Sequence, residues 1–244
     1  MNEKVLVVGV GEIGGPLLEL IRQRYEAYGL DIKPTEPIPH CEIMHICFPF
    51  NGEDFVRESV RYIKKHQPSL AIVNSTVAPG TTRRIATESG MAVVNSPVRG
   101  KHARMKEEML QYTKFVGAIT KEAGEKAAQH FTNIGMRPKL VSSPEASELA
   151  KLTETTYFGV LISWAQEVER YCKEIGADYD EVVSFYEEIR FFPPVKFFPG
   201  IIGGHCVMPN IKILKERFKS GILDAVEKSN EIKQQDLGAD GWTK

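Results

Sequence analysis

The sequence predicts an α/β fold in which a doubly wound parallel sheet precedes an all-helical domain with one long helix. Two observations support this prediction. Short apolar, β-branched runs alternate with amphipathic segments over the first 142 residues. Beyond Pro144 the apolar residues instead recur near the helical period, without a break, to about Gly176. We therefore expect a first domain at 1–142, a helical domain at 143–232 and a loose tail at 233–244.

The first predicted strand, KVLVV, runs into the glycine turn GVGEIG and then into a helix. This is the GxGxxG pattern of dinucleotide-binding Rossmann domains. Gly9 permits the tight turn, Gly11 lets a pyrophosphate approach the backbone, and Gly14 lets the helix pack on the strand. Glu12 and Ile13 complete the turn and are assigned to the same cofactor site. A purely structural glycine turn is the alternative interpretation.

An acidic residue follows at the position that this interpretation requires. Asp31 ends the second apolar segment, about 20 residues beyond the glycine turn. A carboxylate there accepts hydrogen bonds from a ribose diol and repels a 2′-phosphate, so we expect NAD rather than NADP. The chain between Asp31 and the next strand is too short for the usual third strand and crossover helix of the first mononucleotide-binding half.

The remaining elements of the sheet domain follow in alternation. Further strands are expected at 42–50, 70–80, 91–97, 114–119 and 137–141, and helices at 52–66, 81–90 and 122–135. Beyond the long helix we expect a shorter helix at 180–189 and another at 210–218.

The long helix has Ser143 as its predicted N-cap. Its apolar positions occupy more than one face, so it carries more apolar surface than one small helical domain can cover. We therefore expect a homodimer that packs through this helix. Cys172 lies in the apolar stripe and is interpreted as a core residue. The stripe consists of Leu149, Leu152, Thr156, Val160, Trp164, Val168, Cys172 and Ile175.

Composition excludes several classes of partner. Lys and Arg number 31 against 32 for Asp and Glu, so the chain carries no electrostatic footprint for nucleic acid or an anionic membrane. A small-molecule substrate is expected instead. The N-terminal apolar run is too short to span a membrane and lacks a cleavage site, which favours a cytoplasmic protein. The spacing of His40, Cys41, His45 and Cys47 does not match a metal-ligand pattern, so no metal is expected.

The segment PGIIGGHCVMPN places Cys206 behind two glycines and ahead of a helix. Together with other segments, it makes the sequence resemble the nucleotide-sugar 6-dehydrogenases, the family of UDP-glucose and GDP-mannose dehydrogenases. The other matching segments, in family order, are VVGVGEIG, NSTVAPGTTR, NSPVRG and ELAKLTETTYFGVLISWAQEVERYCKEIGAD. The resemblance covers nearly the whole chain, but it includes no counterpart of the family's third domain, which closes over the sugar nucleotide.

The resemblance implies an NAD-dependent oxidoreductase with Cys206 as covalent nucleophile and Lys151 as the polar, acid-base group. A thiolate holds an aldehyde as a thiohemiacetal, whose further oxidation gives a thioester. Gly203 and Gly204 leave room for substrate beside the sulfur, and the following helix N-terminus favours the thiolate form. A small buried thiol and a solvated helix lysine are the alternative interpretations of Cys206 and Lys151.

Further candidates lie at the ends of predicted strands, where open α/β sheets bind ligands. Pro49 and Thr76 are assigned to the cofactor, and the Pro79 and Thr81 positions would bring a helix N-terminus to it. Simple N-capping is the alternative for the threonines. The residues assigned to substrate binding are Arg99, Lys101, Gly203, Gly204 and His205. Arg99 and Lys101 would bind a substrate phosphate, or are solvated loop charges.

Three positions depart from the family pattern. Val98 stands where the family commonly has glutamate, Thr155 where it has asparagine, and Asn210 where it has aspartate. Because a general base contributes 10²- to 10⁴-fold in rate, loss of these groups puts the hydrolytic half of the reaction in doubt. Two alternatives stay open: a two-domain dehydrogenase of a smaller hydroxy acid with one hydride transfer, and a non-enzymatic NAD-binding regulatory protein.

Overall fold

The computed structural model describes residues 3–31, 37–100, 104–189, 197, 199–204 and 206–239. The chain divides into two compact units, Met1–Lys151 and Leu152–Lys244. This division falls inside the long helix, whereas the boundary predicted from the sequence lies at the start of that helix. Each unit is described by itself below.

The first unit is built on a seven-stranded sheet with the order β2-β1-β3-β4-β5-β6-β7. Its strands are β1 (Lys4–Val8), β2 (Glu26–Leu30), β3 (Ile43–Ile46), β4 (Leu70–Val73), β5 (Val93–Asn95), β6 (Thr113–Ala118) and β7 (Arg137–Val141). All neighbouring strands pair in parallel except β5 and β6, which are antiparallel. The predicted doubly wound sheet is confirmed, but the expectation that it is parallel throughout is wrong at this pair. The connection between these strands returns to the edge at which β5 ended, and α4 (Met105–Gln111) lies within it.

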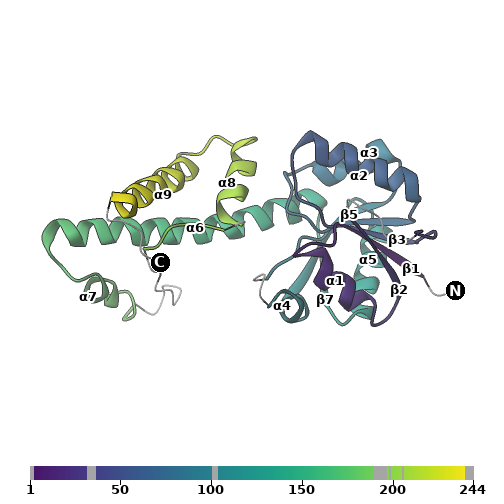
Figure 1. The fold of residues 1–244 in the computed structure, drawn as a ribbon, viewed down its shortest axis with the longest axis horizontal. Helices are drawn as coiled ribbons and strands as arrows, with labels where there is room; N and C mark the ends of the chain where they lie inside the picture. The colour runs from purple at the N-terminus through teal and green to yellow at the C-terminus, as the bar shows by residue number, and fades with distance from the viewer. Residues whose placement is uncertain are drawn as a thin grey trace. The chain divides into compact units, whose positions relative to one another are not determined.

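Helices cover both faces of this sheet, as Figure 1 shows. Their bounds are α1 (Gly14–Ile21), α2 (Glu53–His66), α3 (Thr81–Ser89) and α5 (Lys121–Asn133). One apolar cluster joins the sheet to α1, α4 and α5, and a second joins it to α2 and α3. α2 is typical: its buried residues Phe55, Val56, Ser59 and Ile63 recur at helical spacing along one side.

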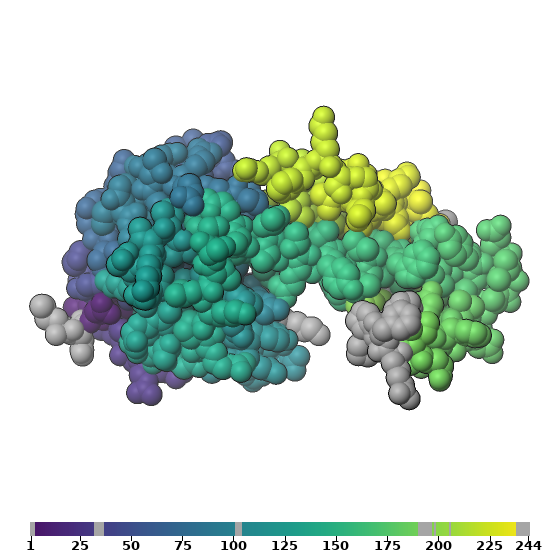
Figure 2. Space-filling model, turned by 180° about the vertical axis from the view of Figure 1, so that it is seen from behind, coloured from purple at the N-terminus to yellow at the C-terminus, as the bar shows by residue number. Residues whose placement is uncertain are grey.

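The long helix α6 (Pro144–Ile175) begins in the first unit and continues through the second. Its predicted N-cap is confirmed, because Ser143 Oγ accepts a hydrogen bond of 3.1 Å from the backbone N–H of Ala146. The other helices of the second unit are α7 (Tyr179–Ser184), α8 (Val207–Lys215) and α9 (Gly221–Ala239). α8 and α9 pack along α6 in Figures 1 and 2. The core between them consists of Leu152, Ile202, Val207, Ile211, Leu214, Leu223 and Val226.

The helical unit differs from its prediction in three places. α7 ends at Ser184 because the next amides bond three residues back instead of four, as Tyr186 does to Val183 at 3.0 Å. α8 begins at Val207, three residues before the predicted start, so Cys206 becomes its N-cap residue. α9 was not predicted, and it runs into the segment expected to be a loose tail. Its buried Lys233 ties it to α6 through a 2.5 Å bond to Glu169, a contact that apolar periodicity does not reveal.

Candidate functional site

The glycine turn after β1 has a distinct requirement at each glycine. Gly9 has a φ of +86°, and a Cβ there would lie 2.8 Å from the backbone nitrogen of Phe48. A Cβ on Gly14 would lie 1.8 Å from the carbonyl oxygen of Gly9, so only glycine allows α1 to pack this close. A Cβ on Gly11 would meet no atom within 4 Å. Strain and contact therefore account for Gly9 and Gly14, whereas the open space at Gly11 fits the approach of a ligand.

Asp31 follows the carboxyl end of β2, beside this turn. Its Oδ2 accepts a hydrogen bond of 3.4 Å from the backbone N–H of Val10, and Gly9 N–H donates to Leu30 O at 2.8 Å. Glu12 is exposed, as a ligand-facing residue of the turn should be. Ile13 is instead half-buried and packs against the apolar core, so its side chain has a structural role.

The other predicted cofactor residues lie at the same edge of the sheet. Because β1 to β5 are parallel, their carboxyl ends share one edge, and the loops that leave it carry Pro49, Thr76 and Arg99. Pro49 is exposed, and Thr76 and Arg99 are half-buried. The structure therefore brings Gly9, Asp31 and these three residues to a single edge. Lys101, also assigned to this region, lies outside the described residues.

The N-terminus of α3 is occupied from within the chain. Glu148 on α6 accepts hydrogen bonds from the backbone N–H groups of Gly80 (2.7 Å) and Thr82 (2.8 Å), while Thr81 is buried. The expectation that this helix end meets the cofactor is therefore wrong for these two amides. A carboxylate from α6 takes the place of the anion that a helix N-terminus attracts.

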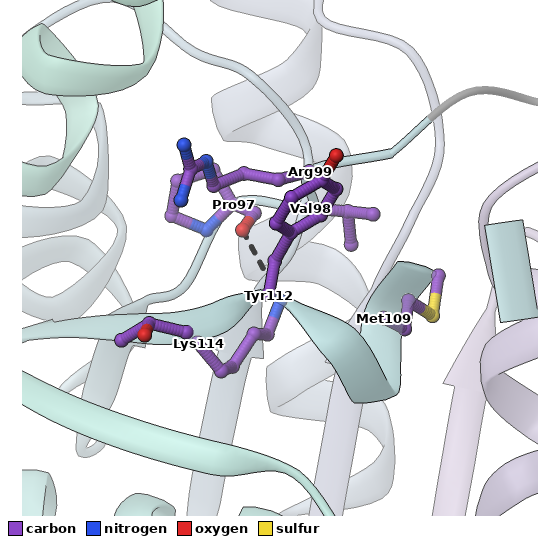
Figure 3. Close-up of a pocket in the computed structure, with 7 residues that line it drawn as sticks. Pro97, Val98, Arg99, Met109, Tyr112 and Lys114 are labelled. Atoms are coloured by element: carbon purple, nitrogen blue, oxygen red, sulfur yellow. Dashed lines mark hydrogen bonds between the residues drawn. The ribbon is translucent and has the colours of Figure 1, made fainter. Parts of the chain in front are cut away.

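A small pocket lies beside the loop after β5 (Figure 3). It is lined by Pro97, Val98, Arg99, Met109, Tyr112, Thr113 and Lys114. The guanidinium carbon of Arg99 lies 5.3 Å from the ring centroid of Tyr112 and 5.7 Å from that of Phe115. Val98, one of the departures from the family pattern, is 6% exposed and belongs to the apolar core. The pocket thus joins an apolar wall to an arginine that stacks on aromatic rings.

Lys114 is buried next to this pocket. Its Nζ donates to Ser96 O at 2.7 Å, to Pro97 O at 3.2 Å and to Asn74 Oδ1 at 3.3 Å. These three acceptors match the three protons of an ammonium group. Burial is the main cause that lowers the pKa of Lys114 to about 7; Cys47 opposes this shift and the charge of Lys151 adds to it.

A chain of buried polar side chains continues from Lys114. Asn74 Nδ2 bonds His45 Nδ1 at 2.9 Å, and His45 Nε2 bonds His130 Nε2 at 2.9 Å. Because the Asn74 oxygen accepts from Lys114, its amide donates to His45, which in turn donates to His130. His130 Nδ1 has no hydrogen-bond partner among the described residues. Burial lowers the pKa of His130 to about 4 and that of His45 well below its ordinary value, so both are neutral near pH 7.

The sequence analysis did not predict this set of bonded polar side chains. The signal that could have revealed it is a single polar residue inside an apolar strand, as with His45 in IMHI and Lys114 in TKFVGA. Such a residue must find partners when the strand is buried on both faces.

Cys206 is exposed and stands at the N-cap position of α8. Gly203 and Gly204 before it are exposed, and a Cβ on either would meet no atom within 4 Å. Gly204 also has a φ of +76°, which side chains rarely adopt. The described residues therefore leave an open approach at these glycines, next to the cysteine. His205 lies outside the described residues.

Two departures from the family pattern form a pair in the second unit. Asn210 is 4% exposed, and its Nδ2 donates to Thr155 Oγ1 at 2.7 Å. Thr155 Oγ1 in turn donates to Leu152 O at 3.0 Å. Neither member of this pair carries a charge. Lys151, one turn before Thr155, is half-buried and belongs to the first unit.

The other three cysteines are less exposed than Cys206, because Cys41 and Cys172 are buried and Cys47 is half-buried. Cys172 is 4% exposed in an apolar cluster with Val168 and Val183, which confirms its predicted place in the core. Burial raises the pKa of Cys41 to about 11 and that of Cys47 to about 12. Within the described parts of the chain, no three His, Cys, Asp or Glu side chains are grouped so that they could hold a metal ion.

Known proteins are similar to this chain in sequence and in fold. Over 302 aligned positions the chain is 22% identical to UDP-N-acetyl-D-mannosamine dehydrogenase of Methanocaldococcus jannaschii, covering 98% of this chain and 70% of that protein. The structure of UDP-D-ManNAc dehydrogenase from Pyrococcus horikoshii matches with a TM-score of 0.83 and 19% identity, over 97% of this chain and 70% of that one. The structure of 3-hydroxyisobutyrate dehydrogenase from Mycobacterium tuberculosis matches with a TM-score of 0.76 and 14% identity, over 98% of this chain and 95% of that one.

In sequence and in fold the chain is similar to nucleotide-sugar dehydrogenases. Residues 145–232 match the sequence profile of the UDP-glucose/GDP-mannose dehydrogenase family, central domain, and the resemblance predicted from the sequence is thereby confirmed. The chain spans from about half (48%) to 70% of the length of the first two curated relatives. Among the described helices, none combines the length and the apolar character that crossing a membrane requires.

Proposed function

We propose that the protein is an NAD-dependent dehydrogenase that oxidises a CH–OH group of a sugar nucleotide. The observation that carries this proposal is the turn after β1, where Gly9 and Gly14 are sterically required and Gly11 faces open space beside Asp31. The family match over 145–232 supports the substrate class. The named activities of the relatives are those of the relatives, and the similarity of this chain to them supports the proposal.

The residues at the carboxyl edge fit a dinucleotide. The open side of Gly11 and the N-terminus of α1 would receive the pyrophosphate, and the exposed Asp31 carboxylate would bond the adenosine ribose. Glu12, Pro49 and Thr76 would complete the cofactor site. Bound NAD supplies the acceptor for the hydride that leaves the substrate carbon.

Cys206 is the proposed nucleophile for the aldehyde that the first oxidation produces. Its sulfur would form a bond to the carbonyl carbon, and a proton would pass to the carbonyl oxygen, which gives a thiohemiacetal. Transfer of a second hydride from that carbon to a second NAD, with loss of the hydroxyl proton, would leave a thioester, which water would cleave to the acid and the free thiol. The exposed position of Cys206 beside Gly203 and Gly204 fits such an attack. Lys151 is the proposed acid-base group for the reacting oxygen, and Arg99 the proposed phosphate ligand.

Three uncharged residues limit the hydrolytic step of this reaction: Thr155, Asn210 and Val98. None of them can take a proton from water, and Val98 is packed in the core of the first unit. We therefore propose that hydrolysis of the thioester is slow. Substrate would then remain attached to Cys206, or leave as an aldehyde after one hydride transfer.

The test is a steady-state assay of NADH formation with a panel of sugar nucleotides and small hydroxy acids. Turnover with a sugar nucleotide, abolished in Cys206→Ser at the second oxidation, would support the proposal. Mass spectrometry of the protein after incubation with substrate and NAD should show an adduct on Cys206 or an aldehyde product. Efficient release of the free acid with two NADH per sugar would contradict slow hydrolysis.

The nucleophile has its own test. Cys206 is exposed and Cys172 is buried, but both are cysteines of the helical unit. Iodoacetamide should label Cys206 faster than Cys172, and addition of substrate with NAD should protect Cys206. Equal labelling rates, or labelling that substrate does not slow, would remove Cys206 from the mechanism.

A second candidate function is the oxidation of a smaller hydroxy acid. It is favoured by the match to the 3-hydroxyisobutyrate dehydrogenase structure, which this chain covers over 95% of its length. Such a reaction needs one hydride transfer and no thiol, so Cys206→Ser should then keep full activity. Binding of NAD without turnover of any panel member would instead favour a regulatory protein.

We also propose a homodimer formed through α6. Tyr157, Trp164 and Tyr171 recur every seven residues on this helix and are 48% to 54% exposed. This spacing places them on one stripe, as in helices that pack against a second helix. Val160, included in the predicted stripe, is half-buried and packs into the core of its own unit.

A further inference from the structure

We propose that Glu148 is a positioning residue: its carboxylate holds the loop after β4 against the base of α6 and so fixes the placement of Lys151. This inference rests on the proposed function for the role of Lys151. All of the groups involved belong to the first unit.

The contact joins two segments that are distant in the sequence. Glu148 is 1% exposed, and each of its carboxylate oxygens accepts one backbone N–H from the start of α3. Gly80, the N-cap residue of α3, has no side chain that could cap this end. Glu148 therefore caps α3 from another helix. The same loop, between β4 and α3, carries Thr76, which is proposed to meet the cofactor.

A neighbouring carboxylate shows what is unusual about Glu148. Glu145, one turn earlier on α6, pairs with the exposed Arg83 side chain through bonds of 2.6 and 3.1 Å. That pair remains accessible to water, where ion pairs contribute little stability. Glu148 instead accepts from two backbone N–H groups, those of Gly80 and Thr82. It thus fixes backbone positions directly.

A second bond anchors the same turn of α6. Ser147 Oγ donates to Asn95 Oδ1 at 2.5 Å, and Asn95 ends β5. Adjacent residues of α6 are therefore bonded to the segments that follow β4 and to the end of β5. Lys151 stands three residues beyond Glu148, on the same side of the helix. A helix held at this turn cannot rotate or slide without breaking buried bonds.

The protonation of Glu148 supports a role in placement. Burial is the main cause that raises its pKa to about 7; the hydrogen bonds from Thr82 and Gly80 oppose this shift, and the charge of Glu145 adds to it. Arg83 on α3 is the basic group that faces it. Because the folded-state pKa lies above the ordinary value of 4.5, the ionised carboxylate costs the fold stability as pH rises from 4.5 to about 7. Ionised Glu148 lowers the stability of the fold but still accepts two backbone hydrogen bonds. We therefore infer that its role is to position these backbone groups.

The decisive comparison is Glu148→Gln against Glu145→Gln. Glutamine keeps one acceptor but turns an NH₂ group toward the second backbone N–H, whereas the Glu145 variant loses only a surface pair. By mass spectrometry we would follow amide exchange over 78–84 and the rate at which a lysine-acylating reagent modifies Lys151. Glu148→Gln should speed exchange about tenfold, because it removes a bond to a charged group, and it should change the Lys151 rate severalfold. Glu145→Gln should change neither.

Turnover gives a readout that a purely structural role would not move. In an active enzyme, Glu148→Gln should lower kcat by about 10- to 100-fold with a smaller change in KM, as expected when a reacting group is misplaced. Wild-type kcat should fall as pH drops through about 7, and this limb should be absent from Glu148→Gln. An unchanged pH profile in the variant would overturn the proposal.

The unmodified protein provides a test that needs neither folding of a variant nor catalysis. Across a pH series, exchange over 78–84 and Lys151 acylation, each corrected for the intrinsic pH dependence of its reaction, should change with one shared midpoint near pH 7. The positioning proposal fails if Lys151 acylation does not follow this midpoint. It also fails if acylation is equal in wild type and Glu148→Gln while amide exchange differs, because Glu148 would then only cap α3. Failure of every substrate in the panel would refute the proposed function and leave this result standing.

Discussion

The two units of the chain differ in their most prominent feature: a connected set of buried polar groups in one and a stripe of exposed aromatic residues in the other. The sheet unit buries a connected set of polar groups, with His45, Asn74, Lys114 and His130 each at most 5% exposed. The helical unit instead leaves large aromatic side chains at its surface, among them Tyr157 and Trp164 at 54% and 50% exposure. Buried polar groups that find partners fix a geometry, whereas exposed apolar stripes are surfaces for contact. The buried bonds fix positions within the sheet unit, whereas the exposed aromatic stripe of the helical unit is where we propose that a second copy packs.

The largest expected effect comes from breaking the buried network at its cation. Lys114→Met fills the space but leaves three acceptors, on Asn74, Ser96 and Pro97, without a donor. We expect the free energy of unfolding to fall by about 3 to 5 kcal/mol, measured by urea denaturation. Lys139→Met is the matched control, because Lys139 is exposed on the neighbouring strand. Similar losses in both variants would mean that the buried hydrogen bonds of Lys114 do not contribute to the free energy of unfolding.

The second prediction breaks the exposed stripe of the helical unit. Trp164→Glu with Tyr171→Glu places charges where a second copy should pack, so the dimer should dissociate at least about tenfold more readily in sedimentation experiments. Unfolding stability of the monomer should change little, since both side chains are about half exposed (50% and 48%). Phe218→Glu, an exposed aromatic outside α6, is the control. A monomeric wild-type protein would refute the proposed dimer.

The third prediction sharpens the comparison through pH. His130 is held neutral with a pKa of about 4, whereas an unfolded histidine titrates near 6.5, so protons favour the unfolded chain between these values. Stability from this group is therefore complete above 6.5 and lost as pH falls toward 4. His130→Gln keeps an acceptor for His45 but cannot titrate. Relative to that variant, the free energy of unfolding of the wild type should fall by about 2 kcal/mol between pH 7.5 and pH 5. The less buried His66, as His66→Gln, should show a smaller difference; equal slopes would contradict the assignment.

The contrast between the units also explains what could be predicted from the sequence. The turn at Gly9 and Gly14 is local, and its spacing alone predicted the strand, the turn and the helix that the structure contains. The seven-stranded sheet and α6 follow from periodicity in the same way. The bond between Glu148 and Gly80 spans 68 residues, and that between His45 and His130 spans 85, so no local pattern could reveal either. α9 was missed for a similar reason, because Lys233 and Asn230 are fixed by distant partners.

The smallest expected effect concerns a polar group that the sheet unit leaves exposed. Asp31 is open to solvent, and its bond from the Val10 N–H is long (3.4 Å), so its loss should alter the fold little. Its carboxylate would bond the adenosine ribose of NAD and repel the additional phosphate of NADP. Calorimetry should therefore show that wild type binds NAD more tightly, and that Asp31→Ala reduces the difference between the two cofactors by about tenfold, or about 1.4 kcal/mol. Glu125→Ala, which removes an exposed acid on α5, controls for a general loss of negative charge. Tighter binding of NADP to the wild type, or an equal effect of both substitutions, would remove Asp31 from the cofactor site and leave the carboxyl edge defined by its glycines alone.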